Sequence, residues 1–226
     1  MFDKLLDRVL IIAPHSDDDI LGCGGLMKKV KNEGGEVHVV VATVGDVKFY
    51  HSNALVTADT RENEFYNALF ELNADSGEIL YRHSEQRLHT MPIVDLVTEF
   101  DQRVRKFKPT AVFLPYPSFH QDHKTVFDAS FAALRPTPNT SHVKLVAMYE
   151  YPFVVWHVGE LGGSSFHLDI TDVIDDKIRA MECHKSQIRE ASHLISPQTI
   201  RMWAERRGVE VGLPYAEAFK ALRMVV

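Results

Sequence analysis

Residues 9–25 read VLIIAPHSDDDILGCGG, and this stretch decides the fold class. Val9–Ala13 is a short run of mostly branched apolar residues, which is typical of a strand buried on both faces. The apolar spacing after it predicts a helix that Gly34 and Gly35 end. The chain therefore passes from a central strand to a helix within a few residues, and His15 and three consecutive aspartates lie at the turn.

The acidic triplet Asp17–Asp19 needs an explanation, because neighbouring carboxylates repel one another and raise each other's pKa. A helix N-terminus can accept such charges through its dipole and its free N–H groups. For the three aspartates alone, this role at a helix N-terminus is the simpler interpretation. The imidazole of His15 beside them favours a bound cation instead, so we expect a metal site at this turn.

The composition limits the class of protein. The chain has 226 residues, of which 45% are hydrophobic, and no linker, repeat or charge block divides it, so we predict a single domain over residues 1–226. A net charge of −6 argues against a nucleic-acid surface. We expect no membrane partner, because no apolar run is long enough to span a bilayer and no signal peptide is recognisable. Two cysteines fit a reducing compartment, so we predict a cytoplasmic protein and leave homo-oligomerisation open.

Predicted strands and helices alternate along the chain. Strands are predicted over residues 9–13, 36–42, 78–81, 110–114, 145–149 and 166–170. Helices are predicted after the first motif and over residues 58–72, 93–107, 126–134, about 171–188 and 199–207. A further segment at 215–222 is assigned neither type. This alternation predicts an α/β fold, a Rossmann-like three-layer sandwich with a mainly parallel central sheet. In such sheets, ligands bind at the carboxyl ends of the strands.

A second polar motif follows the strand predicted over residues 110–114. Residues 116–123 read YPSFHQDH, so two histidines and an acid leave the carboxyl end of another central strand. His15 and Asp18 are three residues apart, as are the two histidines here, and this spacing puts both side chains of a pair on one face of a helical turn. Three protein ligands with an open fourth position are typical of catalytic zinc. The two motifs together predict such a site, with a carboxylate and a histidine left for proton transfer.

The two motifs resemble those of the PIG-L (LmbE-like) family of zinc-dependent de-N-acetylases. The family's His-Pro-Asp-Asp-Glu stands here as His15-Ser16-Asp17-Asp18-Asp19, and its His-Pro-Asp-His stands as His120-Gln121-Asp122-His123. Further similar segments follow in the same order along nearly the whole chain: Arg61–Glu64, Asp169–Ile170 with Lys177, His184–Gln187 and Tyr215–Phe219. Two prolines and a glutamate of the family are replaced here, but no ligand or acid–base group is lost.

The resemblance implies that His15, Asp18 and His123 bind zinc, with ferrous iron as the alternative metal. It also implies that Asp17 is the general base that takes a proton from the attacking water. The residues themselves agree with this division, because adjacent side chains on a turn diverge and Asp17 cannot easily share a metal with Asp18.

Three further roles follow from the resemblance. His120 would protonate the leaving amine or stabilise the tetrahedral oxyanion. Asp122 would lie behind His120, fix its tautomer and favour its cationic form. Arg61 would bind the substrate; the alternative is a surface arginine at a helix start, where the helix dipole disfavours a cation.

The resemblance implies a zinc-dependent N-deacetylase, because members of the family remove acetyl groups from N-acetylglucosamine units. The expected partner is a small, soluble N-acetylated amino sugar, and residues 153–165 and 194–212 are predicted to border its site. The alternative is a hydratase that acts on an unsaturated dicarboxylic acid with the same metal site. A non-catalytic Rossmann-type binding module also stays open. A magnesium phosphohydrolase is disfavoured by the histidine ligands.

Overall fold

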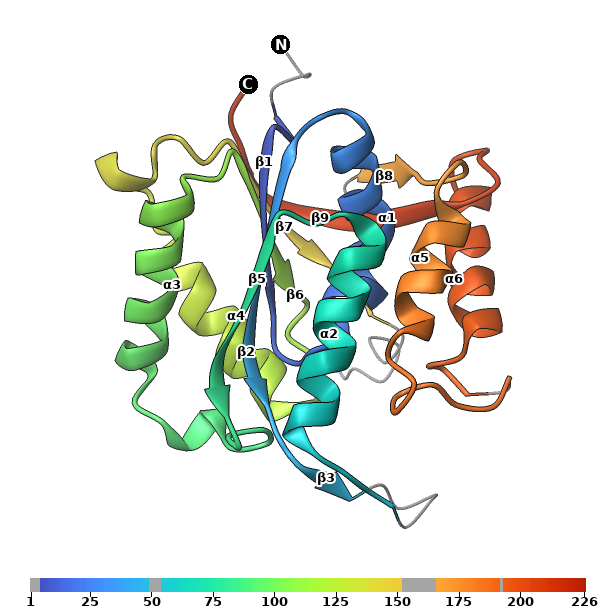
Figure 1. Ribbon diagram of the computed structural model, residues 1–226. Helices are drawn as coiled ribbons and strands as arrows, with labels where there is room; N and C mark the ends of the chain where they lie inside the picture. Colours follow the sequence, from blue (N-terminus) through green and yellow to red (C-terminus); the bar gives the residue numbers. More distant parts are fainter. Residues whose placement is uncertain (1–4, 49–53, 152–165, 192) are drawn as a thin grey trace.

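The computed structural model describes residues 5–48, 54–151, 166–191 and 193–226. Figure 1 shows a central sheet seen nearly along its plane, with helices on both faces. In the described part of the chain, this sheet has seven strands in the order β5-β2-β1-β6-β7-β9-β8. The α/β sandwich with a mainly parallel sheet is therefore confirmed.

The strands of the sheet are mostly parallel. Their bounds are β5 (Ser76–Arg82), β2 (Glu36–Val44), β1 (Arg8–Ala13), β6 (Ala111–Pro115), β7 (Leu145–Tyr149), β9 (Ala216–Met224) and β8 (Phe166–Asp169). The strands from β5 to β7 run parallel, and Ile11 of β1 lies between Val39 and Phe113 in the register. β9 runs antiparallel to both of its neighbours, β7 and β8. The central strand β1 is buried on both faces, as its apolar run predicts.

Helices form the two outer layers. On one face lie α1 (Asp18–Asn32), α2 (Ala58–Leu72), α5 (Ile174–Glu182) and α6 (Pro197–Val209), and on the other lie α3 (Ile93–Phe107) and α4 (Gln121–Ala133) (Figure 1). Alternate residues of β1 point to opposite faces of the sheet. Ile11 packs on the face covered by α1, and Ile12 packs on the face covered by α3 and α4. Two apolar layers therefore share one sheet among the described residues.

The structure corrects two predicted helix bounds. α4 begins at Gln121 rather than at residue 126, because the His120 imidazole accepts a hydrogen bond from the Asp122 N–H and caps the helix. α5 ends at Glu182 rather than near residue 188. There the chain turns back, and Glu64 of α2 holds the turn by accepting hydrogen bonds from the N–H and hydroxyl of Ser186.

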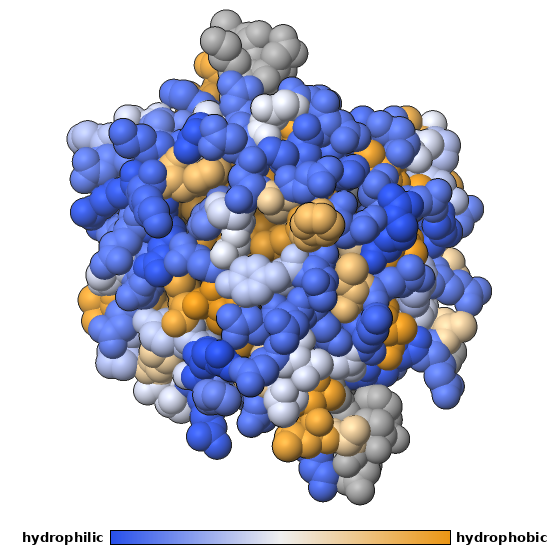
Figure 2. All heavy atoms as spheres, in the orientation of Figure 1, coloured by the Kyte–Doolittle hydropathy of each residue, from blue (hydrophilic) through white to orange (hydrophobic). Residues whose placement is uncertain are grey.

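The short connections contain elements that the sequence did not predict. These are the antiparallel pair of β3 (Val47–Lys48) with β4 (Leu55–Val56), and the 3₁₀ turns at Leu88–Thr90 and Pro138–Thr140. The face of the molecule in Figure 2 is largely hydrophilic, with apolar residues scattered over it. None of the helices in the described segments is long and apolar enough to cross a bilayer.

Candidate metal centre

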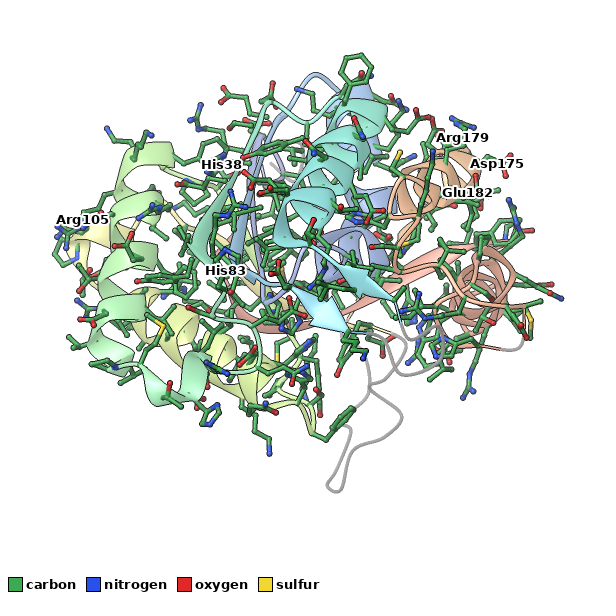
Figure 3. The ribbon with its side chains drawn as sticks, turned by 60° about the horizontal axis from the view of Figure 1, so that its bottom comes forward. His38, His83, Arg105, Asp175, Arg179 and Glu182 are labelled. Carbon is green, nitrogen blue, oxygen red and sulfur yellow. The ribbon has the colours of Figure 1, made fainter. Side chains whose placement is uncertain are left out.

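The two polar motifs meet at one edge of the sheet. β1 ends at Ala13 and α1 begins at Asp18, while β6 ends at Pro115 and α4 begins at Gln121. Because β1 and β6 are neighbouring parallel strands, both strand-to-helix turns leave the same edge. Figure 3 brings this edge forward, and the labelled His83, which follows β5, helps to locate it. The sequence prediction that the motifs share one edge is confirmed.

Three side chains of these turns converge. One possible ligand atom from each of His15, Asp18 and His123 lies within 4.8 Å of the others, and all three residues are buried. Asp18 Oδ2 lies between the two imidazoles, 3.2 Å from His15 Nδ1 and 3.3 Å from His123 Nε2. The backbone N–H of His15 also donates to this oxygen, at 3.1 Å. The strand-to-helix turn thus closes on itself and presents Asp18 toward His123.

The charges of this cluster depend on one another. Burial opposes a charge on Asp18, but the His123 and His15 imidazoles outweigh it and hold the pKa of the carboxyl below its usual range. Burial also opposes a charge on His15, yet its hydrogen bonds with Asp122 and Asp18 raise its pKa to about 10. Without a metal, His15 is therefore protonated near neutral pH, and its positive charge lies where the metal ion would bind.

The residues present fit a divalent transition-metal ion. Two imidazoles and one carboxylate are the donor set of open, catalytic zinc sites, and they also suit ferrous iron. His123 turns Nε2, and His15 turns Nδ1, toward the same Asp18 oxygen, so the three donor atoms meet at one place. His15 shows the arrangement that metal-binding histidines usually have, with its other nitrogen held by a carboxylate.

That supporting carboxylate belongs to Asp122, which we expected behind His120. Asp122 Oδ2 lies 3.1 Å from His15 Nε2. The same carboxylate accepts the backbone N–H groups of Gln86 and Leu88, at 2.6 and 3.2 Å. Asp122 contacts the His120 ring through a hydrogen bond that its backbone N–H donates to Nδ1 at 3.2 Å. The structure thus links this acid to the orientation of His15.

His120 is less basic than the resemblance implies. Burial and the nearby imidazoles of His15 and His123 lower its pKa to about 4, although Asp122 opposes the shift. The three rings lie close together, with the His120 centroid 5.0 Å from that of His15 and 5.4 Å from that of His123. Because Nδ1 accepts a backbone N–H, the neutral ring carries its proton on Nε2.

Asp17 is buried at the N-cap of α1, but its side chain makes no capping hydrogen bond. The carboxylate is therefore not used by the helix, and Asp17 lines the pocket beside the cluster. Burial raises its pKa to about 6, and the charge of Asp18 adds to the effect while Arg61 opposes it. A carboxyl group with this pKa can accept a proton near neutral pH.

The pocket at this edge has a volume of about 260 Å³. It is lined by His15, Asp17, Asp18, Leu21, Arg61, Glu85, Phe119, His120, His123, Tyr151, Gln187 and Ile195. Arg61 is only 2% exposed, and its guanidinium pairs with Glu85. It therefore belongs to the pocket wall rather than to the outer surface.

Glu85, Tyr151 and Gln187 were not among the residues predicted for the site. Glu85 follows β5, so the rule that ligands bind at strand carboxyl ends could have indicated it. Gln187 lies in a segment that resembles the family, but the same segment falls within the helix predicted to end near residue 188. Of the two segments predicted to border the site, 194–212 contributes Ile195, whereas 153–165 lies outside the described residues.

The family model described as PIG-L, GlcNAc-PI de-N-acetylase, matches residues 10–134 of this chain. The match covers more than half of the chain and includes both motifs. The chain belongs to the PIG-L family.

Similar proteins match this PIG-L family member over most of its length. A diacetylchitobiose deacetylase of Thermococcus kodakarensis is 28% identical over 94% of this chain and 82% of its own length. A probable N-acetyl-alpha-D-glucosaminyl L-malate deacetylase 2 of Bacillus subtilis is 24% identical over 80% of this chain and 83% of its own. The crystal structure of a conserved protein of Thermus thermophilus superposes with a TM-score of 0.76 and 25% identity, covering 98% of this chain and 96% of that one.

Proposed function

We propose that this protein hydrolyses the N-acetyl group of a small amino sugar or amino-sugar conjugate, with a divalent ion held by His15, Asp18 and His123. The convergence of one ligand atom from each of these residues within 4.8 Å carries the proposal. Membership of the PIG-L family supports the reaction, and the names of the relatives support an N-acetylated sugar as substrate. Zinc is the metal we propose, and ferrous iron is the alternative.

When bound, such an ion lowers the pKa of a water molecule from 15.7 to about 7 and polarises the acyl carbonyl. Asp17 is the group that takes the proton from the attacking water. Its raised pKa of about 6 supports this role, because a base with a pKa near the working pH transfers protons most effectively. Its freedom from helix capping keeps the carboxylate available to the pocket.

For His120, the geometry favours the oxyanion over the leaving amine. The ring is neutral near pH 7 and carries its proton on Nε2, so it donates one hydrogen bond to the negative oxygen that forms during attack. Asp17, having taken a proton, then delivers it to the departing nitrogen. This division needs no second protonated acid in the pocket.

Two further residues have supporting roles in this proposal. Asp122 fixes His15 through Nε2 and thus presents the other imidazole nitrogen toward Asp18. Arg61 contacts hydroxyl groups of the sugar together with Glu85, whose carboxylate balances its charge. A pocket wall with paired charges suits a neutral, hydroxyl-rich substrate.

The test combines metal analysis with a substrate screen. The purified protein should retain about one zinc or iron per chain and release acetate and free amine in equal amounts from at least one N-acetylglucosamine derivative. A panel of unsaturated dicarboxylic acids, assayed for hydration, tests the alternative lyase reaction. Metal-loaded protein that hydrates such an acid and releases no acetate would contradict the deacetylase proposal, and protein that binds no metal would support a binding module.

A further inference from the structure

A buried ion pair lies against the middle of α1, outside the pocket residues that bind or react. Lys177 of α5 and Glu217 of β9 are each only 4% exposed, and Lys177 Nζ lies 2.6 Å from Glu217 Oε1. Burying two charges is expensive unless hydrogen bonds satisfy the rest of their capacity. Here the backbone of α1 satisfies it.

Both charges bind backbone groups of a single turn of α1. The Glu217 carboxylate accepts the N–H groups of Gly25 and Leu26, each at 2.8 Å. The Lys177 ammonium donates to the carbonyl of Leu21 at 2.9 Å. In a regular helix, the Gly25 N–H and the Leu21 carbonyl are partners of each other. Here each has a charged side-chain partner, as the groups at helix ends do.

Glycine is required where the pair approaches. A Cβ atom on Gly24 would lie 3.0 Å from Lys177 Cγ, and one on Gly25 would lie 3.1 Å from Glu217 Oε1 and 2.5 Å from Ile170 Cγ2. Any larger residue would hold α5 and β9 away from the backbone of α1. The glycines after the acidic triplet therefore admit this ion pair, in addition to letting the helix pack close to the sheet.

Leu21 connects the pair to the candidate metal centre. Its carbonyl accepts from Lys177, and its N–H donates to the carbonyl of Asp17 at 3.0 Å. Its side chain also lines the pocket. One residue thus separates the buried charges from the first turn of α1, which carries Asp17 and Asp18.

We propose that Lys177 and Glu217 are positioning residues that bind α1 at its middle turn and thereby fix its first turn, with Asp17 and Asp18, against His123. The proposal rests on the metal centre of the proposed function, and it gives a task to two charges that the reaction does not use. Neither residue touches the substrate or the metal. Their effect reaches the centre through the backbone of α1.

The test is the zinc affinity of Glu217→Gln, measured by competition with a chromophoric chelator. The amide keeps the shape of the carboxylate but offers only one acceptor atom, so one of the two N–H groups loses its partner. We expect the Kd for zinc to rise by about 10- to 100-fold, the range found when residues that support metal ligands are changed. We also expect kcat to fall more than KM rises.

Val104→Ala is the matched control, because Val104 is buried in α3 on the opposite face of the sheet. It should lower Tm and leave the zinc affinity unchanged. The proposal is overturned if Glu217→Gln binds zinc as tightly as a control variant with the same Tm. If the single variant fails to fold, the double variant Lys177→Met/Glu217→Gln replaces it in the test. It removes both charges, so neither is left buried without its partner. It should also bind zinc at least about tenfold more weakly than the wild type, and equal affinity overturns the proposal.

Zinc affinity does not depend on deacetylation. If the wild type binds zinc and releases no acetate, the proposed function fails while the comparison of variants still tests the positioning. If the wild type releases acetate and Glu217→Gln matches it in zinc affinity and kcat, the positioning fails and the proposed function stands.

Discussion

At the scale of single residues, a substitution of Asp17 tests proton transfer without removing a metal ligand. Asp17→Asn should lower kcat by about 10²–10⁴-fold, the usual contribution of one positioned base. Zinc content should stay at the wild-type level, because the Asp17 side chain is not among the three converging ligands. Steady-state acetate release with metal analysis of the same preparation measures both. A variant that keeps its zinc and turns over normally would remove Asp17 from the mechanism.

Asp122 gives a second prediction at this scale. Because its carboxylate holds His15 Nε2, Asp122→Asn should weaken zinc binding by about 10- to 100-fold. If Asp122 served His120 instead, kcat would fall while the Kd for zinc stayed constant. Chelator competition and initial rates on the same variant distinguish these two outcomes.

His15 predicts how metal binding depends on pH. Its pKa is raised to about 10 by the hydrogen bonds with Asp122 and Asp18 that outweigh burial, so near pH 7 the metal-free ring carries a proton that zinc must displace. Zinc affinity should therefore rise about tenfold per pH unit between roughly pH 6 and 8. Calorimetry in buffers of different ionisation enthalpy should show about one proton released. Binding without proton release would contradict this charge state.

The sequence predicted the converging residues better than their partners. Spacing within each motif indicated that His15 shares a face with Asp18 and His120 with His123, and the family resemblance then selected His123 rather than His120 as the ligand. The contact of Asp122 with His15 could not be predicted, because it depends on how two turns far apart in the chain face each other. Glu85 lies in neither motif, and only the sheet order brings it to the pocket.

At the scale of elements, the packing of α1 on β7 makes Gly22 necessary. A Cβ atom at this position would lie 2.1 Å from the ring of Tyr149, whose hydroxyl is held by the carbonyl of Ile12 at 3.1 Å. Gly22→Ala should therefore lower the free energy of unfolding by about 1–3 kcal/mol, as overpacked cores do. Urea titration measures the loss.

Asn32→Ala, at the exposed end of the same helix, is the control for Gly22→Ala and should change stability by less than about 0.5 kcal/mol. Equal stability of the two variants would contradict the close approach of α1 to β7.

The elements themselves were mostly predictable, and their ends were less so. Apolar runs and helical spacing locate every strand of the main sheet except β9, because the pattern of residues 215–222 favours neither a strand nor a helix. The missed bounds have different causes. α4 begins early because the adjacent His120 caps it through a local hydrogen bond to the Asp122 N–H, whereas α5 ends early because Glu64, far away in the chain, holds Ser186. Local sequence carries no signal for the distant contact between Glu64 and Ser186.

At the scale of the whole molecule, we propose that the chain is one domain, as its unbroken composition predicts. Both apolar layers share the strands of a single sheet, so neither should unfold without the other. Thermal unfolding followed by far-ultraviolet circular dichroism and by tryptophan fluorescence should give one coincident transition. Two separated transitions would contradict the proposal.

Metal removal should shift that transition. Zinc that binds only the folded state at 100 times its Kd should stabilise the protein by about 2.7 kcal/mol, so a chelator should lower Tm. The triple change of His15, Asp18 and His123 to alanine should remove the response to zinc. A Tm that does not respond to zinc or chelator would show that the folded protein gains nothing from the metal.

The position of the metal is the most direct measurement of all. A crystal structure of zinc-loaded protein, with anomalous data collected on both sides of the zinc absorption edge, should show one peak about 2.0–2.2 Å from a nitrogen of His15, a nitrogen of His123 and an oxygen of Asp18. Asp17 and His120 should face the open side of that ion. A peak held by other residues, or no peak at zinc concentrations that saturate the protein, would contradict a metal centre shared by the two motifs.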